Sequence, residues 1–333
     1  MVLPRIKVLA LGGTIAMTES AEGGVVPTLN GDMLVKAVPL LGSLADIEAV
    51  SFRQLPGAHL SYDDLSALAA AIEAAVAAGA RGIVVTQGTD TIEETVFALD
   101  RLLDVDAPVI VTGAMRNPTL PGADGPANLL ASVQVACSDE ARGMGGLVVF
   151  SDEIHAARFV RKTHTSSTGA FSSPLAGPIG WVCEGRVRVV NRIQKVAAVG
   201  RGADLVDVAV GLLPISLGDD ARMVEAACAA RLAGLVVDAL GGGHVPAAVS
   251  NALQAAASHM PIVLASRTGD GEVLRGTYGF KGSEMDLLQG GLVRAGWLDG
   301  RKAKVLLTLL LRAGKPGREA VDAAFRPWGG GSA

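Results

Sequence analysis

The sequence has few aromatic residues, no excess of basic charge and no long apolar run. Aromatic residues make up 4% of the 333 residues although 50% are hydrophobic, so the core must be built from Ala, Val, Leu and Ile. The formal charge of −4 and the absence of Lys/Arg runs argue against nucleic acid as a partner. No run reaches the length of about 18 apolar residues that a membrane-spanning helix needs. We therefore expect neither a nucleic-acid partner nor a membrane span.

The three cysteines are too few and too widely spaced for a disulfide framework or a zinc site. An odd number is typical of a reducing compartment, so we expect a cytoplasmic protein. The chain also reaches its first strand almost at once, without the charged, apolar and cleavage segments of a secretory signal. We interpret Cys137, Cys183 and Cys228 as small core residues.

Several common site types lack their sequence signatures. The first glycine turn lacks the Gly-x-Gly-x-x-Gly spacing of a dinucleotide site, and no Gly-Lys-Ser/Thr sequence marks a phosphate loop. The five histidines do not have the spacing of metal ligands, and no Gly-x-Ser-x-Gly elbow is present. We therefore expect no cofactor and no catalytic metal.

Apolar runs recur at residues 6–11, 82–86, 108–112 and 146–150 and alternate with helix-like stretches. Because these runs are apolar without alternation, they are typical of strands buried in a parallel sheet with helices on its faces. A chain of this length normally forms two domains.

The pattern weakens near residues 183–205, which contain short β-like pieces at 186–190 and 196–199. A second, smaller alternation of strands and helices follows. We predict an α/β protein with a larger, mostly parallel, doubly wound N-terminal domain (1–190), a linker (191–206) and a smaller C-terminal α/β domain (207–333). The glycine-rich tail, residues 328–333, is flexible by composition.

Two Gly-Thr turns, at residues 11–14 (LGGT) and 87–90 (QGTD), directly follow apolar runs. Ligands bind beyond the carboxyl ends of parallel strands, and glycine lets the backbone turn sharply and approach a ligand. The helix expected over 91–103 would point its positive end toward Thr89. A threonine hydroxyl is a poor nucleophile without a base, and the Asp90 and Lys162 side chains could provide one. From spacing alone, a surface role for Lys162 and turn capping by the threonines stay open.

These segments resemble the signatures of the bacterial-type L-asparaginase/glutaminase family. The matches are residues 11–16 (LGGTIA), 87–95 (QGTDTIEET), 112–116 (TGAMR), 123–129 (ADGPANL), 161–163 (RKT) and 278–280 (YGF). The resemblance spans nearly the whole chain. It implies two α/β domains and a homodimer or homotetramer with sites completed across a subunit interface.

The resemblance also implies the roles of the catalytic residues. Thr14 corresponds to the nucleophile that attacks the side-chain amide carbon and forms an acyl-enzyme. Thr89 corresponds to the second threonine, assisted by Lys162, and Asp90 to the carboxylate that receives the substrate's α-ammonium. Glu284 falls where a neighbouring subunit contributes a second carboxylate.

Other positions implied to contact the substrate are Gly57, Ala58, His59, Gly88 and Ala114. Two departures concern amino-acid recognition. The loop at residues 23–28 lacks the tyrosine that usually orients the nucleophile, and Ala58 stands where the family often has a serine for the α-carboxylate.

The resemblance therefore implies hydrolysis of L-asparagine to L-aspartate and ammonia, with a small amide as the partner molecule. Two alternatives remain. One is hydrolysis of another small amide or cyclic imide, including glutamine. The other is a non-catalytic amino-acid-binding protein on the same fold.

Overall fold

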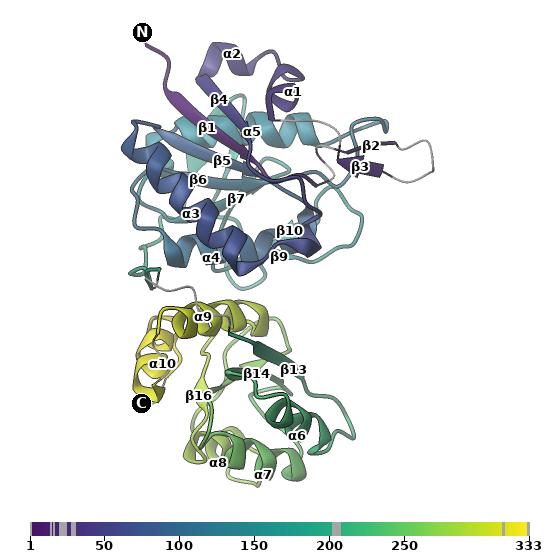
Figure 1. The fold of residues 1–333 in the computed structure, drawn as a ribbon, viewed down its shortest axis with the longest axis vertical. Helices are drawn as coiled ribbons and strands as arrows, with labels where there is room; N and C mark the ends of the chain where they lie inside the picture. The colour runs from purple at the N-terminus through teal and green to yellow at the C-terminus, as the bar shows by residue number, and fades with distance from the viewer. Residues whose placement is uncertain are drawn as a thin grey trace. The chain divides into compact units, whose positions relative to one another are not determined.

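The computed structural model describes residues 2–13, 15, 17–19, 25–27, 31–201, 208–314 and 317–331 (Figure 1). The chain divides into two compact units, Met1–Ala198 and Val199–Ala333. This boundary lies within the segment 191–206 in which we expected a linker. Lys195 belongs to the first unit because its Nζ donates to Asp104 Oδ1 and to the Val105 carbonyl.

The first unit is an α/β structure. Its strands are β1 (Arg5–Ala10), β2 (Met17–Glu19), β3 (Val25–Pro27), β4 (Asp46–Ser51), β5 (Gly82–Thr86), β6 (Val109–Thr112), β7 (Gly146–Phe150), β8 (Glu153–Ala156), β9 (Arg161–Lys162), β10 (Phe171–Ser172), β11 (Gly180–Cys183) and β12 (Arg186–Val189). Its helices are α1 (Gly31–Lys36), α2 (Leu41–Leu44), α3 (Tyr62–Ala77), α4 (Ile92–Leu102) and α5 (Gly125–Cys137), with the 3₁₀ turns η2 (Gly57–His59), η3 (Thr89–Thr91) and η4 (Asp139–Ala141).

The main sheet of this unit has the strand order β12-β11-β8-β7-β6-β5-β1-β4. Strands β7, β6, β5, β1 and β4 run parallel, whereas β8, β11 and β12 are joined by antiparallel pairing. The expected doubly wound sheet is thus confirmed as mostly parallel and mixed at one edge. Because β4 and β5 lie on opposite sides of β1, the carboxyl ends of β1 and β5 form the switch point at which α/β proteins bind ligands.

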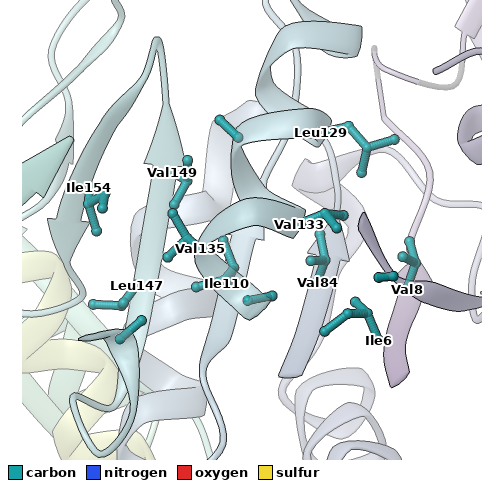
Figure 2. Close-up of a cluster of buried hydrophobic side chains, with 14 of the residues drawn as sticks. Ile6, Val8, Val84, Ile110, Leu129, Val133, Val135, Leu147, Val149 and Ile154 are labelled. Carbon is teal, nitrogen blue, oxygen red and sulfur yellow. The ribbon is translucent and has the colours of Figure 1, made fainter. Parts of the chain in front are cut away.

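Both faces of the central strands β5, β6 and β7 are buried, which explains why these strands lack alternation. On one face, side chains from α5 (Leu129, Val133) pack against strand residues that alternate along β1, β5, β6 and β7, among them Val84 and Ile110 (Figure 2). The intervening strand residues, such as Val85, point to the other face. There α4 packs against β6 and β7, and α3 packs against α4.

Local sequence fixes the ends of α3. Ser61 Oγ accepts the Asp64 backbone N–H, and the Asp64 carboxylate accepts the Ser61 N–H, which together form a capping box. The helix gives way to Gly79, whose φ of +93° is a left-handed conformation that favours glycine. The expected helices over 65–78 and 91–103 therefore correspond to α3 and α4.

The second unit has a four-stranded parallel sheet of order β13-β14-β15-β16. Its elements are β13 (Val210–Pro214), α6 (Arg222–Ala229), β14 (Gly234–Ala239), α7 (Ala247–Ala256), β15 (Ile262–Ser266), α8 (Glu284–Gln289), β16 (Val293–Arg294), α9 (Gly300–Arg312), α10 (Arg318–Phe325) and η5 (Arg326–Trp328). Helix α9 packs against three of the strands. This is the smaller α/β unit that the sequence predicts.

Three local expectations are wrong. Residues 196–199 form no strand. Cys183 and Cys228 are exposed and so are not core residues, whereas Cys137 is half-buried and packs against the core. The tail is packed as far as Gly331, because the Trp328 side chain is buried and the Gly331 N–H donates to the Arg294 carbonyl. A side chain at Gly330 would lie 2.2 Å from that carbonyl oxygen, so this glycine allows close packing. In the described part of the chain, no helix has the length and apolar character needed to cross a membrane.

His155, on β8, is completely buried, with its Nδ1 3.0 Å from Ser173 Oγ. Burial lowers the pKa of His155 from 6.5 to about 4. The carboxylate of Glu153 lies 3.2 Å from Nε2 and opposes this shift, but it is half exposed and therefore screened by solvent.

We expect His155 to make the fold sensitive to acid. The unfolded chain binds the proton near pH 6.5 and the folded chain only near pH 4, so stability falls between these values. The total loss is about 3 kcal/mol, and none occurs above pH 7. Urea unfolding at pH 7 and 4.5 should show a smaller loss for His155→Gln than for the wild type. An equal loss in both proteins would contradict this assignment.

Candidate active site

The two Gly-Thr turns lie side by side at the switch point of the main sheet. Strands β1 and β5 are paired, with Ala10 opposite Thr86, so the turns that follow them meet. Gly13 has a φ of +86°, and a Cβ placed there would lie 2.0 Å from the backbone nitrogen of Gly88. Only glycine permits this approach of the two backbones.

Two further strand ends reach the same place. A Cβ on Gly57, in the segment after β4, would lie 2.9 Å from the Gly88 carbonyl oxygen. A Cβ on Gly113, directly after β6, would lie 2.6 Å from the carbonyl oxygen of Gln87. The backbone segments that follow four neighbouring strands of the sheet, β6, β5, β1 and β4, therefore meet at one site.

Lys162 joins this site from a two-stranded ribbon formed by β9 and β10. Its Nζ donates hydrogen bonds to Thr89 Oγ1 at 2.9 Å and to Asp90 Oδ1 at 2.7 Å. Thr89 is buried and Lys162 is mostly buried, whereas 68% of the Asp90 side chain is exposed. The structure thus brings together the three residues Thr89, Asp90 and Lys162.

This arrangement can polarise a hydroxyl. A lysine that donates to a threonine oxygen can accept the hydroxyl proton once it has lost a proton of its own, as a general base must. Asp90 holds the lysine on the other side, and its exposed carboxylate can also receive a cation from solvent. The Thr89 backbone lies at η3, just before the N-terminus of α4, where the helix dipole favours negative charge.

Ala114 is buried directly after β6, and two side chains hold its neighbours. The Asp124 carboxylate accepts the backbone N–H groups of Met115 and Arg116. Asn128 Nδ2 donates to the Gly113 carbonyl. Asp124 and Asn128 were not predicted as site residues, although they lie in the ADGPAN segment that carries the family resemblance. An Asp and an Asn four residues apart at the start of a helix are the signal that could have found them.

Ala58 and His59 lie on η2 and are exposed. Thr91 Oγ1 donates to the Gly57 carbonyl at 2.9 Å and so fixes η2 against η3. Gln87 Nε2 lies 3.3 Å from the same Thr91 hydroxyl. The sequence-predicted residues Gly57, Ala58 and His59 therefore lie beside Gly88, at the same end of the sheet as Lys162.

Thr14 lies outside the described residues, as do residues 23, 24 and 28 of the loop in which the usual tyrosine is missing. Its neighbours are described. Gly13 contacts Gly88, and Ile15 is buried within 3 Å of the position of a Cβ on Gly125.

Glu284 belongs to the second unit and begins α8. Its side chain is completely buried; Oε1 accepts the backbone N–H groups of Thr277 and Tyr278, and Oε2 lies 3.2 Å from His244 Nε2. Burial alone would raise the pKa of Glu284, but the N–H donors of Tyr278 and Thr277 outweigh it and hold the pKa below its ordinary value. His244 in turn packs edge-on against Tyr278 and Phe280, which are exposed.

Within the described ranges, no group of three or more His, Cys, Asp or Glu side chains has the arrangement of a metal site.

Comparison with known proteins identifies the family. Residues 5–195 match the model of the asparaginase N-terminal domain, and residues 209–325 match that of the glutaminase/asparaginase C-terminal domain. The chain belongs to the asparaginase family. Both units are therefore asparaginase domains, and the resemblance stated from the sequence is confirmed.

Individual relatives agree with this assignment. A probable L-asparaginase of Deinococcus radiodurans is 35% identical over 97% of both chains. A probable periplasmic L-asparaginase of Haemophilus influenzae is 32% identical over 93% of this chain and 89% of its own. The crystal structure of a probable cytoplasmic L-asparaginase from Campylobacter jejuni superposes with a TM-score of 0.86 at 30% identity, covering 97% of this chain and 99% of that chain.

Proposed function

We propose that this protein hydrolyses L-asparagine to L-aspartate and ammonia through a threonine acyl-enzyme. The observation that carries the proposal is the contact of Lys162 Nζ with both Thr89 Oγ1 and Asp90 Oδ1 at the switch point of an asparaginase domain. A protein that only binds an amino acid has no use for a hydroxyl polarised in this way.

In the proposed reaction, the Thr14 hydroxyl adds to the carbon of the side-chain amide. Its proton passes to the amide nitrogen, the C–N bond breaks and ammonia leaves, so that an aspartyl ester remains on Thr14. Water, activated at Thr89 by Lys162, then attacks the ester and releases aspartate. The Thr89 backbone N–H stabilises the oxyanion that forms in both steps.

Substrate recognition is assigned to the groups around this centre. Asp90 receives the α-ammonium of the substrate, because its carboxylate is largely exposed while Lys162 holds it in place. The segment Gly57, Ala58 and His59 receives the α-carboxylate through backbone N–H groups and the imidazole. Gly88 and Ala114 complete the site through their backbones.

We further propose that the protein assembles as a homodimer or homotetramer in which Glu284 is the second carboxylate for the α-ammonium at a neighbour's site. Within its own unit Glu284 is buried and bonded on both oxygens, and it holds the Tyr278 backbone and the His244 side chain. Two exposed free cysteines favour a reducing compartment and thus a cytoplasmic location.

Ammonia release from a panel of L-asparagine, L-glutamine, D-asparagine and simple amides tests the proposed function. We expect the highest kcat/KM for L-asparagine. Faster release from an amide without an α-carboxylate would instead favour the alternative substrate class, to which the missing hydroxyl at Ala58 points. Ring opening of a cyclic imide releases no ammonia and is followed by the loss of the imide itself. A protein that neither releases ammonia from any of these amides nor opens an imide would be a binding protein.

The replacement Ala58→Ser is expected to strengthen binding of L-asparagine. It restores one hydrogen bond to a charged carboxylate, a contribution of roughly 1.5–3 kcal/mol, so KM should fall by about tenfold or more. The measurement is the KM for L-asparagine, with an amide lacking the α-carboxylate as the control substrate. Ala58→Gly, which adds no hydroxyl, serves as the control variant. An unchanged KM in Ala58→Ser would show that this segment does not contact the α-carboxylate.

A further inference from the structure

Lys162 is carried by a ribbon that is separate from the main sheet. Strands β9 and β10 pair with each other, with Lys162 opposite Phe171, and with no other strand in the described part of the chain. The ribbon is attached to the rest of the unit by side chains. The Phe171 ring packs on the Phe150 ring, with the ring centroids 4.8 Å apart. Ser173, just after β10, has its Oγ within hydrogen-bond distance of Nδ1 of the buried His155. Both of these attachments hold β10, the strand that does not carry the lysine.

Glu93 ties β9 to α4. This residue lies in the first turn of α4, only 2% exposed, and its Oε2 accepts the backbone N–H of Lys162 at 2.9 Å. Lys162 is therefore held at both ends by one short segment of chain. Glu93 holds its backbone, and Thr89 and Asp90 hold its ammonium.

We propose that Glu93 is a positioning residue that sets the distance between the Lys162 ammonium and the Thr89 hydroxyl. The inference rests on the proposed function of this site. A lysine ammonium sits at the end of a flexible four-carbon stem and has no preferred position of its own. Its place at Thr89 depends on where the Lys162 backbone is fixed, and an error of about 1 Å can lower a catalytic rate by roughly a hundredfold.

Two conservative replacements distinguish the effect of the Glu93 side-chain length from the effect of its charge. Glu93→Gln removes the charge but keeps an oxygen that can accept the Lys162 N–H. Glu93→Asp keeps the charge but shortens the side chain by one methylene and withdraws the oxygen. We expect Glu93→Gln to retain most of the wild-type kcat for L-asparagine, and Glu93→Asp to lose roughly 10- to 100-fold in kcat with little change in KM.

A double-mutant cycle tests whether the loss passes through the lysine. In a Lys162→Met background, Glu93→Asp should lower kcat no further, because the group it positions is already gone. An independent loss in that background would mean that Glu93 acts on α4 or Thr89 instead. Ser173→Ala is the matched control, since it removes one of the two attachments of β10 and should reduce stability more than kcat.

Amide hydrogen exchange at Lys162 supplies a readout that does not depend on activity. In protein with ¹⁵N-labelled lysine, the Lys162 amide should be protected in the wild type and in Glu93→Gln, and should exchange faster in Glu93→Asp. Equal protection in all three, or a larger loss of kcat in Glu93→Gln than in Glu93→Asp, would overturn the inference. A wild-type protein without amidase activity but with this exchange pattern would instead refute the proposed function alone.

Discussion

Replacing Thr89 with valine is expected to lower kcat for L-asparagine by roughly three orders of magnitude or more. When several residues act as one catalytic unit, removing any one of them abolishes nearly all of the activity. Valine keeps the shape of threonine but removes the oxygen to which Lys162 Nζ donates. The measurement is the steady-state rate of ammonia release, together with the melting temperature as a check on folding.

Thr86→Val is the matched control for this experiment. Thr86 lies three residues earlier, at the end of β5, and is completely buried; within the described structure its hydroxyl has no hydrogen-bond partner. Removal of such a hydroxyl should cost neither activity nor stability. If Thr89→Val retained the rate of the Thr86→Val control, Thr89 would have no part in the mechanism.

Lys162→Met is the second variant with a large expected effect. It should lower kcat far more than it raises KM, because the ammonium contacts Thr89 and Asp90 rather than open solvent. Its cost in stability should be about 1 kcal/mol or less, since the Asp90 carboxylate left behind is largely exposed and hydrated. Kinetics and urea unfolding measure the two effects separately.

Lys195→Met controls for the loss of a lysine in an ion pair. Lys195 has nearly the same exposure as Lys162 and pairs with the exposed Asp104 at 3.1 Å, but it lies at the end of the first unit. The Lys195→Met replacement should reduce kcat little. A normal kcat with a raised KM in Lys162→Met would assign Lys162 to substrate recognition.

Much of this site was predictable because it is built from strand ends. The apolar runs at 6–11 and 82–86 are long enough to identify β1 and β5, and their pairing brings the two glycine turns together. The sequence could not fix the contact of Lys162 with Thr89, which lies 73 positions away and depends on a ribbon of two-residue strands. Strands this short carry no periodicity.

Other features were missed for similar reasons. The roles of Glu93, Asp124 and Asn128 depend on hydrogen bonds to backbone groups that are distant in the sequence or lie in turns. The glycine content of the tail predicts flexibility, whereas in the structure Gly330 and Gly331 permit close backbone contacts. The exposed cysteines show that the usual burial of a residue type does not predict whether a particular residue of that type is buried.

The proposed mechanism requires an ester between the substrate's acyl group and a threonine of this chain. Lys162→Met, in which turnover should be slow enough for the ester to accumulate, can be incubated with L-asparagine, quenched in acid and analysed by mass spectrometry of the intact protein and its peptides. We expect an added aspartyl group on the peptide that contains Thr14. An active protein with no acyl adduct, or with the adduct on Thr89, would contradict the proposed mechanism.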